Sequence, residues 1–116
     1  MARRGDAARL AAYVDAGAPV DLTNAAGDTL VMLAAYHGHA ETVSVLVERG
    51  ANVNLCNDRG QSPLAGAVFK SNDAVVKVLL AAGADPDMGT PSARDTAHMF
   101  GQRQFESWFD ASDQVD

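Results

Sequence analysis

Residues 27–39 read GDTLVMLAAYHGH, and the rest of the chain is best understood outward from this stretch. Residues 29–37 contain no Gly or Pro and are mostly apolar, which predicts a short helix. Gly38 ends that run, because glycine readily adopts the left-handed backbone conformation found after many helices. A second apolar run, residues 40–49, follows at once and stops at Gly50. The stretch therefore begins a pair of short helices joined by a tight turn.

The same pattern returns every 33 residues along the chain. Gly17, Gly50 and Gly83 open the similar phrases GAPVD, GANVN and GADPD, and Gly27 and Gly60 keep the same spacing. Residues between one helix pair and the next are rich in Asn, Asp and Gly, which is typical of turns and hairpin loops. Helices of three turns or fewer are too short to be stable alone. Repeated units of this kind must stack on one another, which predicts an all-α solenoid.

At this point the chain resembles the ankyrin-repeat family, whose signature is G-x-T-P-L-H-x-A-A-x-x-G-H. The second copy, residues 60–67, reads GQSPLAGA and keeps the Pro and Leu of that signature. The resemblance covers roughly residues 1–109 and implies stacked helix-turn-helix units joined by hairpin loops. The histidine of the signature is absent from all three units, so its usual hydrogen bond to the Thr or Ser hydroxyl is expected to be lost or altered. Its positions hold Met32, Ala65 and Asp95.

We expect one ankyrin-repeat domain over residues 1–109, followed by an acidic, disordered tail at residues 110–116. The expected units are residues 1–24, 25–57, 58–90 and 91–109. The last hairpin loop is three residues shorter than the one before it. The last helix, expected over residues 104–109, carries three rings at i, i+3 and i+4, and this spacing predicts an apolar cap. The rings belong to Phe105, Trp108 and Phe109.

The first unit starts late, with residues 1–4 as all that remains of its first helix. This shortening predicts that apolar faces of the second unit, around Val31 and Ala34, are partly uncovered. A second copy of the chain, another subunit or a missing N-terminal segment would then cover them. We expect a monomer, with a dimer through the truncated first repeat as the alternative.

Composition and charge exclude several classes of function. The net charge of −6 argues against a broad nucleic-acid-binding surface, and no apolar run is long enough for a membrane span or signal peptide. The lone Cys56 fits a reducing compartment, so we expect a cytoplasmic protein. Arginine outnumbers lysine and alanine is abundant, which suggests a GC-rich and bacterial coding sequence.

Chemistry-bearing residues do not form a recognisable catalytic or metal pattern. His37 and His39 flank Gly38, and residues two apart do not share a helical face. Cys56 lies in a polar loop with no base at helical spacing to activate it. We therefore expect no enzyme activity, no cofactor and no metal.

The family resemblance implies a concave side formed by inner helices and hairpin tips, where partners usually dock. The chain has only seven aromatic residues, and three of them stand just before the inter-helix turns. We expect this row to bind another protein, although the rings would also serve simply to shield the alanine-rich helices. The predicted binding residues before the turns are Tyr36, His37, Phe69, Lys70, Met99 and Phe100. The predicted rim residues at the hairpin tips are Asp28, Asp58, Arg59 and Gln61.

The sequence thus predicts a non-catalytic protein-interaction module that binds through its concave groove. Two other functions stay open. The first alternative is a structural or regulatory subunit of a larger assembly. The second is an inhibitor that blocks an enzyme cleft with its short C-terminal repeat. The identity of the partner is not readable from the sequence, because such grooves vary freely on a fixed scaffold.

Overall fold

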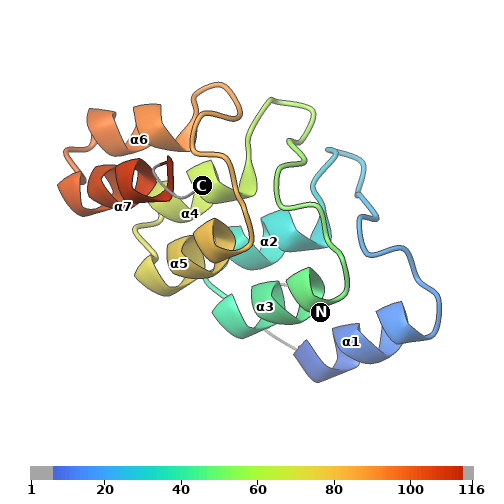
Figure 1. Cartoon of the computed structure of the whole chain (residues 1–116). Coiled ribbons are helices and arrows are strands. Elements are labelled where there is room, and N and C mark those ends of the chain that lie inside the picture. The colour runs from blue at the N-terminus through green and yellow to red at the C-terminus, as the bar shows by residue number, and fades with distance from the viewer. Residues whose placement is uncertain (1–6, 114–116) are drawn as a thin grey trace.

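The computed structural model describes the backbone of residues 7–113 and the side chains of residues 10–111 (Figure 1). This part of the chain forms helices and no strands, so the all-α expectation is confirmed; two isolated bridges join Thr23 to Thr29 and Gly89 to Ser92. The helices are α1 (Ala7–Asp15), α2 (Leu30–Tyr36), α3 (Ala40–Glu48), α4 (Pro63–Phe69), α5 (Asp73–Ala81), α6 (Ala93–Met99) and α7 (Arg103–Asp113).

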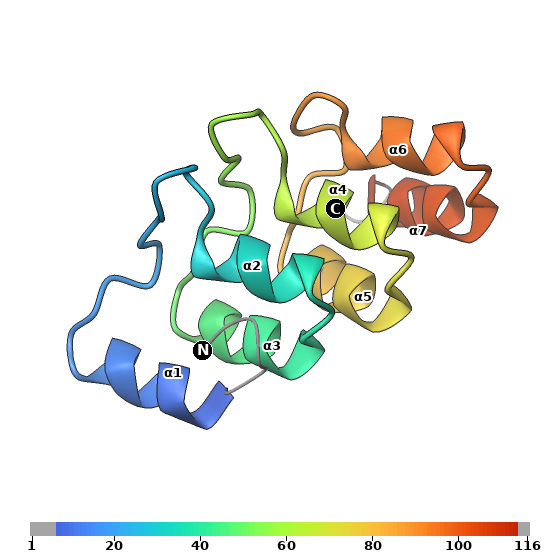
Figure 2. The same ribbon diagram turned by 180° about the vertical axis from the view of Figure 1, so that it is seen from behind.

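The helices form two layers that run along the stack. Helices α2, α4 and α6 make one row, and α1, α3, α5 and α7 make the other (Figures 1 and 2). Within a repeat the two helices pack together, as in α2 with α3, and each inner helix also packs on the next, as in α2 with α4. The long loops between repeats all project to the same side (Figure 2). This arrangement is a solenoid with an inner helix layer, an outer helix layer and a fringe of hairpins.

Each inner helix begins with the same hydrogen bond. The hydroxyl oxygens of Thr29, Ser62 and Ser92 accept from the backbone N–H three residues on, each at 3.1 Å. Such a cap satisfies one of the free N–H groups at a helix start. The donors are the backbone N–H groups of the positions where the family signature has histidine. The substitution there therefore changes the side chain and leaves the helix cap in place.

The expected uncovered face near the first repeat is not found. Val31 and Ala34 are both fully buried, with none of either residue exposed to solvent. Both belong to the same core cluster as Leu46 of α3 and Leu64 of α4. Both therefore belong to the interior that α2, α3 and α4 share, and neither forms part of an uncovered face. The predicted remnant helix at residues 1–4 lies outside the described residues.

The C-terminal repeat confirms the apolar cap and corrects the tail. Phe105 and Phe109 are fully buried, Trp108 is half-buried, and the ammonium of Lys77 lies 5.1 Å from the centre of the Trp108 ring. The last helix does not end at Phe109, because α7 continues to Asp113. Residues 110–113 are thus helical, which contradicts a disordered tail starting at residue 110. The remainder of that predicted tail, residues 114–116, lies outside the described residues.

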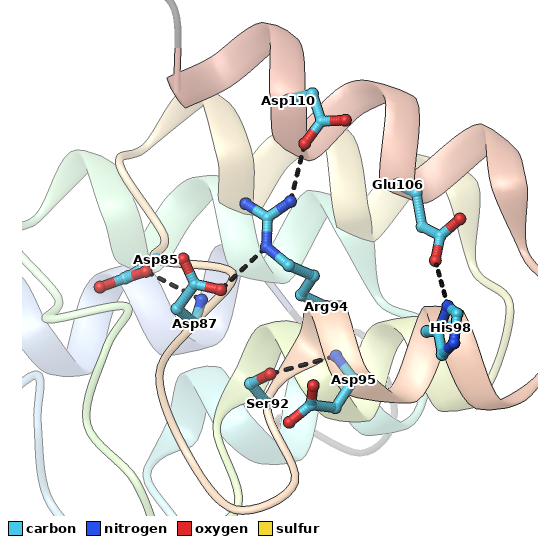
Figure 3. Close-up of polar contacts among 8 residues, drawn as sticks. All are labelled: Asp85, Asp87, Ser92, Arg94, Asp95, His98, Glu106 and Asp110. Atoms are coloured by element: carbon cyan, nitrogen blue, oxygen red, sulfur yellow. Dashed lines mark hydrogen bonds and ion pairs between the residues drawn. The ribbon is translucent and has the colours of Figure 1, made fainter.

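Arg94 contacts the part of α7 that continues beyond Phe109. Its Nε donates to Asp87 Oδ1 at 2.8 Å and its Nη1 donates to Asp110 Oδ1 at 2.7 Å (Figure 3). The guanidinium also lies 5.9 Å from the centre of the Phe109 ring. Arg94 of α6 therefore ties the last hairpin loop to the end of α7, and His98 adds a 3.3 Å contact to Glu106 of the same helix (Figure 3).

The hairpin loops are linked in series by side-chain to backbone hydrogen bonds. Asp21 Oδ1 accepts from the N–H of Asn52 at 2.9 Å, and Asn54 Oδ1 accepts from the N–H of Asp85 at 2.8 Å. Asp21 and Asn54 are 33 residues apart, as are Asn52 and Asp85, so the bond repeats with the sequence period. The loops are therefore held in a fixed order beside the inner helices.

No helix in the described part of the chain is long and apolar enough to cross a membrane.

Candidate functional site: a concave groove

Large apolar side chains stand exposed at the C-terminal ends of the inner helices. The exposed fraction is 39% for Tyr36, 55% for Phe69, 62% for Met99 and 57% for Phe100. These residues come from α2, α4 and α6 or the cap position that follows α6. Contiguous exposed apolar surface is uncommon on a protein surface and usually marks a binding site.

The side chains before the turns contact one another from one repeat to the next. The rings of Phe69 and Phe100 meet edge to face, with centroids 5.8 Å apart. One repeat earlier, the ammonium of Lys70 lies 4.8 Å from the centre of the Tyr36 ring. Phe100 and Lys70 stand immediately before the residue of the turn, whereas Phe69 and Tyr36 stand one residue earlier in their repeats. The rings of Tyr36 and Phe69 thus each contact a side chain of the next repeat and still keep a large exposed area.

An apolar depression of about 390 Å³ lies beside these rings. Its floor includes Gly66, which stands in the middle of α4 where an ordinary helix would carry a side chain. A Cβ placed at Gly66 would lie 3.6 Å from Met32 Cε and 3.7 Å from Tyr36 Cδ1, which is ordinary van der Waals contact. The glycine therefore deepens the depression without being required by close packing. The other lining residues are Met32, Tyr36, Gln61, Ala65, Phe69, Pro91, Thr96, Met99 and Phe100.

A second depression, of about 320 Å³, has a more polar lining. Its residues are Asp28, Met32, Leu33, Tyr36, His37, Arg59 and Gln61. Met32, Tyr36 and Gln61 line both depressions. We call the two together the concave groove, with an apolar half toward α6 and a polar half toward the tips of the hairpin loops.

Asn57 fixes the geometry of the polar half. Its Nδ2 donates to Asp28 Oδ1 and to Gln61 Oε1, both at 2.8 Å, and its Oδ1 accepts from the backbone N–H groups of Arg59 and Gln61 at 3.0 Å. Asn57 itself is only 7% exposed. One buried amide therefore holds the hairpin, the Asp28 carboxylate and the Gln61 side chain in place. The guanidinium of Arg59 takes no part in this network.

Two cations at the groove have no carboxylate partner among the described residues. These are Arg59, which lines the polar half, and Lys70, which lies over Tyr36. In contrast, Arg49 bonds to Asp15 at 3.1 Å, and Arg94 bonds to Asp87 and Asp110. The groove therefore offers cationic groups to a ligand, whereas Arg49 and Arg94 are paired internally.

Most of the residues predicted from the sequence are brought together in this groove. Eight of the ten line one or both depressions: Asp28, Tyr36, His37, Arg59, Gln61, Phe69, Met99 and Phe100. Lys70 lines neither depression and reaches the groove through its contact with Tyr36. Asp58 also lies outside both linings; it is exposed, and its backbone N–H donates to the carbonyl of Ala26 at 3.0 Å.

Sequence reasoning missed the residues that form the floor of the groove. Leu33 and Gly66 stand three residues before Tyr36 and Phe69, and a separation of three places two residues on the same helical face. That spacing was the signal that would have identified them. Asn57 was also missed; an Asn that starts a turn often bonds to backbone groups two residues on, which is the signal at this position.

The groove holds no recognisable catalytic constellation. No group of three or more His, Cys, Asp or Glu in the described part of the chain is placed to hold a metal ion. Cys56 is half-buried in a hairpin loop, and its Sγ–H donates to the Asn54 carbonyl at 3.9 Å. Burial raises the pKa of the Cys56 thiol, which disfavours the reactive thiolate.

A two-layered solenoid with a concave groove defines a class of repeat proteins that carry binding surfaces. The sequence profile described as ankyrin repeats in three copies matches residues 1–90, which is most of the chain. The chain therefore belongs to the ankyrin-repeat family. Ankyrin repeats are in general protein-protein interaction modules, and the family is typically non-catalytic.

A curated relative is an ankyrin repeat protein of Pseudomonas aeruginosa. It is 49% identical over 41 residues, which are 35% of this chain and 24% of the relative. The match thus spans about a quarter of the length of that relative. A bacterial relative agrees with the bacterial origin suggested by the amino-acid composition.

Proposed function

We propose that this protein binds another protein through the concave groove and has no chemistry of its own. The observation that carries the proposal is the set of large apolar side chains that stay 39–62% exposed around the apolar half. Aromatic side chains are enriched among the residues that dominate binding energy at protein interfaces. They stand on helices held in a rigid stack, so that little conformational entropy is lost on docking.

The experiment compares the wild-type protein with a Tyr36→Ala, Phe69→Ala double variant in affinity capture from a native lysate. Both side chains are substantially exposed, so their removal leaves the core intact and the far-UV circular dichroism unchanged. We expect the double variant to lose binding free energy of a few kcal/mol at most, which is enough to deplete the captured partner.

A matched control removes two other exposed apolar side chains that lie outside the groove. Tyr13 on α1 is 52% exposed and Leu22 in the first loop is 57% exposed, and neither lines the groove. The Tyr13→Ala, Leu22→Ala variant should capture the partner as the wild type does. Equal capture by the Tyr36→Ala, Phe69→Ala variant would contradict the proposal.

Of the other functions predicted from the sequence, a subunit docked at the N-terminal end loses its premise, because Val31 and Ala34 are fully buried. We keep the monomer as the proposed state, to be tested by light scattering over a range of concentrations.

Inhibition by the C-terminal repeat would need Trp108 to be accessible, but it is half-buried beneath Lys77. We also propose a cytoplasmic location, which the single Cys56 supports and cell fractionation tests.

A further inference from the structure

The two halves of the concave groove differ in chemistry, and this difference indicates what kind of partner segment it takes. The inference rests on the proposed function, because it concerns the occupant of the same groove. Ligand pockets have volumes of roughly 300–1,000 Å³. The apolar half, at about 390 Å³, lies at the lower end of that range. Its size fits a short segment with a bulky side chain rather than a broad protein face.

The apolar half is built to receive an apolar side chain. Gly66 and Ala65 leave its floor low, and the rings of Phe69 and Phe100 stand edge to face at its side. The thioether of Met99, 62% exposed, gives this wall an adaptable surface, because Met is flexible and polarisable. An aliphatic or aromatic side chain entering here would bury the exposed faces of these residues.

Two cations and one carboxylate stand at the polar half and at its junction with the apolar half, so positive charge is in excess there. Arg59 lines it and Lys70 lies at its junction with the apolar half, and neither has a carboxylate partner among the described residues. Asp28, the carboxylate of this half, accepts from Asn57 Nδ2 at 2.8 Å through Oδ1 and from Asn24 Nδ2 at 3.5 Å through Oδ2. Both of its oxygens thus face neighbouring side chains. The complementary group on a ligand is a carboxylate, although the whole chain has a net charge of −6.

We propose that the groove binds a short peptide segment in which a bulky apolar side chain is followed or preceded closely by an acidic residue. The apolar side chain occupies the half lined by Gly66, Phe69 and Phe100. The acidic residue lies against Arg59 and Lys70. The apolar anchor supplies most of the affinity, and the carboxylate supplies selectivity and speeds encounter with the groove.

The test selects a displayed library of random peptides on the full-length protein and measures the enriched peptides by fluorescence anisotropy. The expected enriched sequences contain a large apolar residue near an Asp or Glu and are depleted of Lys and Arg. Replacing the selected acid by its amide should weaken binding about two- to fivefold, which is the effect of losing one exposed ion pair. Binding of the acidic peptides should also weaken as salt is raised.

Two lysine variants make a matched pair for the charge effect. Lys70 and Lys77 both lie over an aromatic ring, but Lys77 stands on the outer helix α5 and outside the groove. Lys70→Glu and Arg59→Glu should each weaken the acidic peptides and favour peptides with Lys or Arg at the same place. Lys77→Glu makes the same change in net charge and should leave the binding constant unchanged.

The outcomes separate this inference from the proposed function. Enriched peptides that lose binding in the Tyr36→Ala, Phe69→Ala variant but show no acidic preference would overturn the charge assignment while leaving the groove as a binding site. Equal weakening by Lys70→Glu and Lys77→Glu would also overturn it. If no peptide is enriched, a short-segment ligand is wrong, whereas the capture experiment decides independently whether the groove binds a protein.

Discussion

Thr42 of α3 and Val75 of α5 occupy the same position in consecutive repeats, and both are fully buried. The hydroxyl of Thr42 has no hydrogen-bond partner in the described part of the chain. A buried polar group without a partner costs about 1–3 kcal/mol. We therefore expect Thr42→Val to raise the free energy of unfolding by about 1 kcal/mol in urea denaturation. Val75→Thr should lower it by a similar amount, and unchanged stability of Thr42→Val would contradict this account.

The turn between α4 and α5 holds a strained serine. Ser71 has a φ of 55°, whereas the equivalent Gly38 and Gly101 have φ of 78° and 65°. The Ser71 hydroxyl accepts from Gln102 Nε2 at 2.6 Å. Ser71→Gly and Ser71→Ala both remove this bond, but only alanine keeps the left-handed strain. We expect the glycine variant to be more stable than the alanine variant by about 1 kcal/mol in urea denaturation. Equal stability of the two variants would show that the turn carries no strain.

The glycine on the groove floor is expected to lower stability. Gly66 lies within α4, does not have a positive φ, and has room for a Cβ. A glycine inside a helix costs about 0.5–1 kcal/mol relative to alanine. Gly66→Ala should therefore raise the thermal midpoint, as measured by circular dichroism, while making the groove shallower. A lower midpoint would mean that Gly66 serves packing rather than the shape of the groove.

The C-terminal clamp should depend on salt. Arg94→Met keeps an apolar stem on Phe109 but removes the ion pairs to Asp87 and Asp110. Exposed ion pairs contribute about 0.2–1 kcal/mol each. We expect a loss of about 1 kcal/mol in unfolding free energy at low ionic strength, shrinking toward about 1 M salt. Asp110→Asn, which removes one of the two pairs, should lose less. An equal loss at both ionic strengths would assign the effect to packing instead.

The thiol of Cys56 should react slowly in the folded protein. Burial raises its pKa, so less thiolate is present at a given pH than in the unfolded chain. The rate of alkylation by iodoacetamide, measured against pH, should therefore rise at a higher pH in native protein than in urea. A native midpoint at or below the unfolded one would show that the loop exposes the thiol.

The sequence period predicts the helix pairs, the glycines that end them and their stacking, because each of these depends on local spacing. Val31 was wrongly expected to be uncovered, since a period does not reveal which side of a helix faces its neighbours. The extent of α7 was likewise missed: Asp110 looks like part of a polar tail until the structure places it against Arg94, 16 residues earlier. Contacts between repeats decide both points, and these are not local in sequence.

The sequence predicted most residues of the candidate site, but not the depth or the charge of the groove. The position before each turn identifies Tyr36 and Phe69, because the family resemblance implies that this position faces the groove. The depth of the groove depends on a residue that is missing a side chain, Gly66, and its charge depends on which cations lack partners. Neither property is visible in a pattern of residue types, since both are defined by what neighbouring repeats bring into reach.

The loop bonds that repeat every 33 residues also bear on how such a chain grows. Asn54 accepts from Asp85 as Asp21 accepts from Asn52, so the loop that carries Asn52 and Asn54 presents a donor on one edge and an acceptor on the other. A tandem duplication of one such segment in the gene would therefore insert a unit that finds its hydrogen-bond partners on both sides. Lengthening the array needs no compensating change, and the groove would gain a further row of variable positions with each copy.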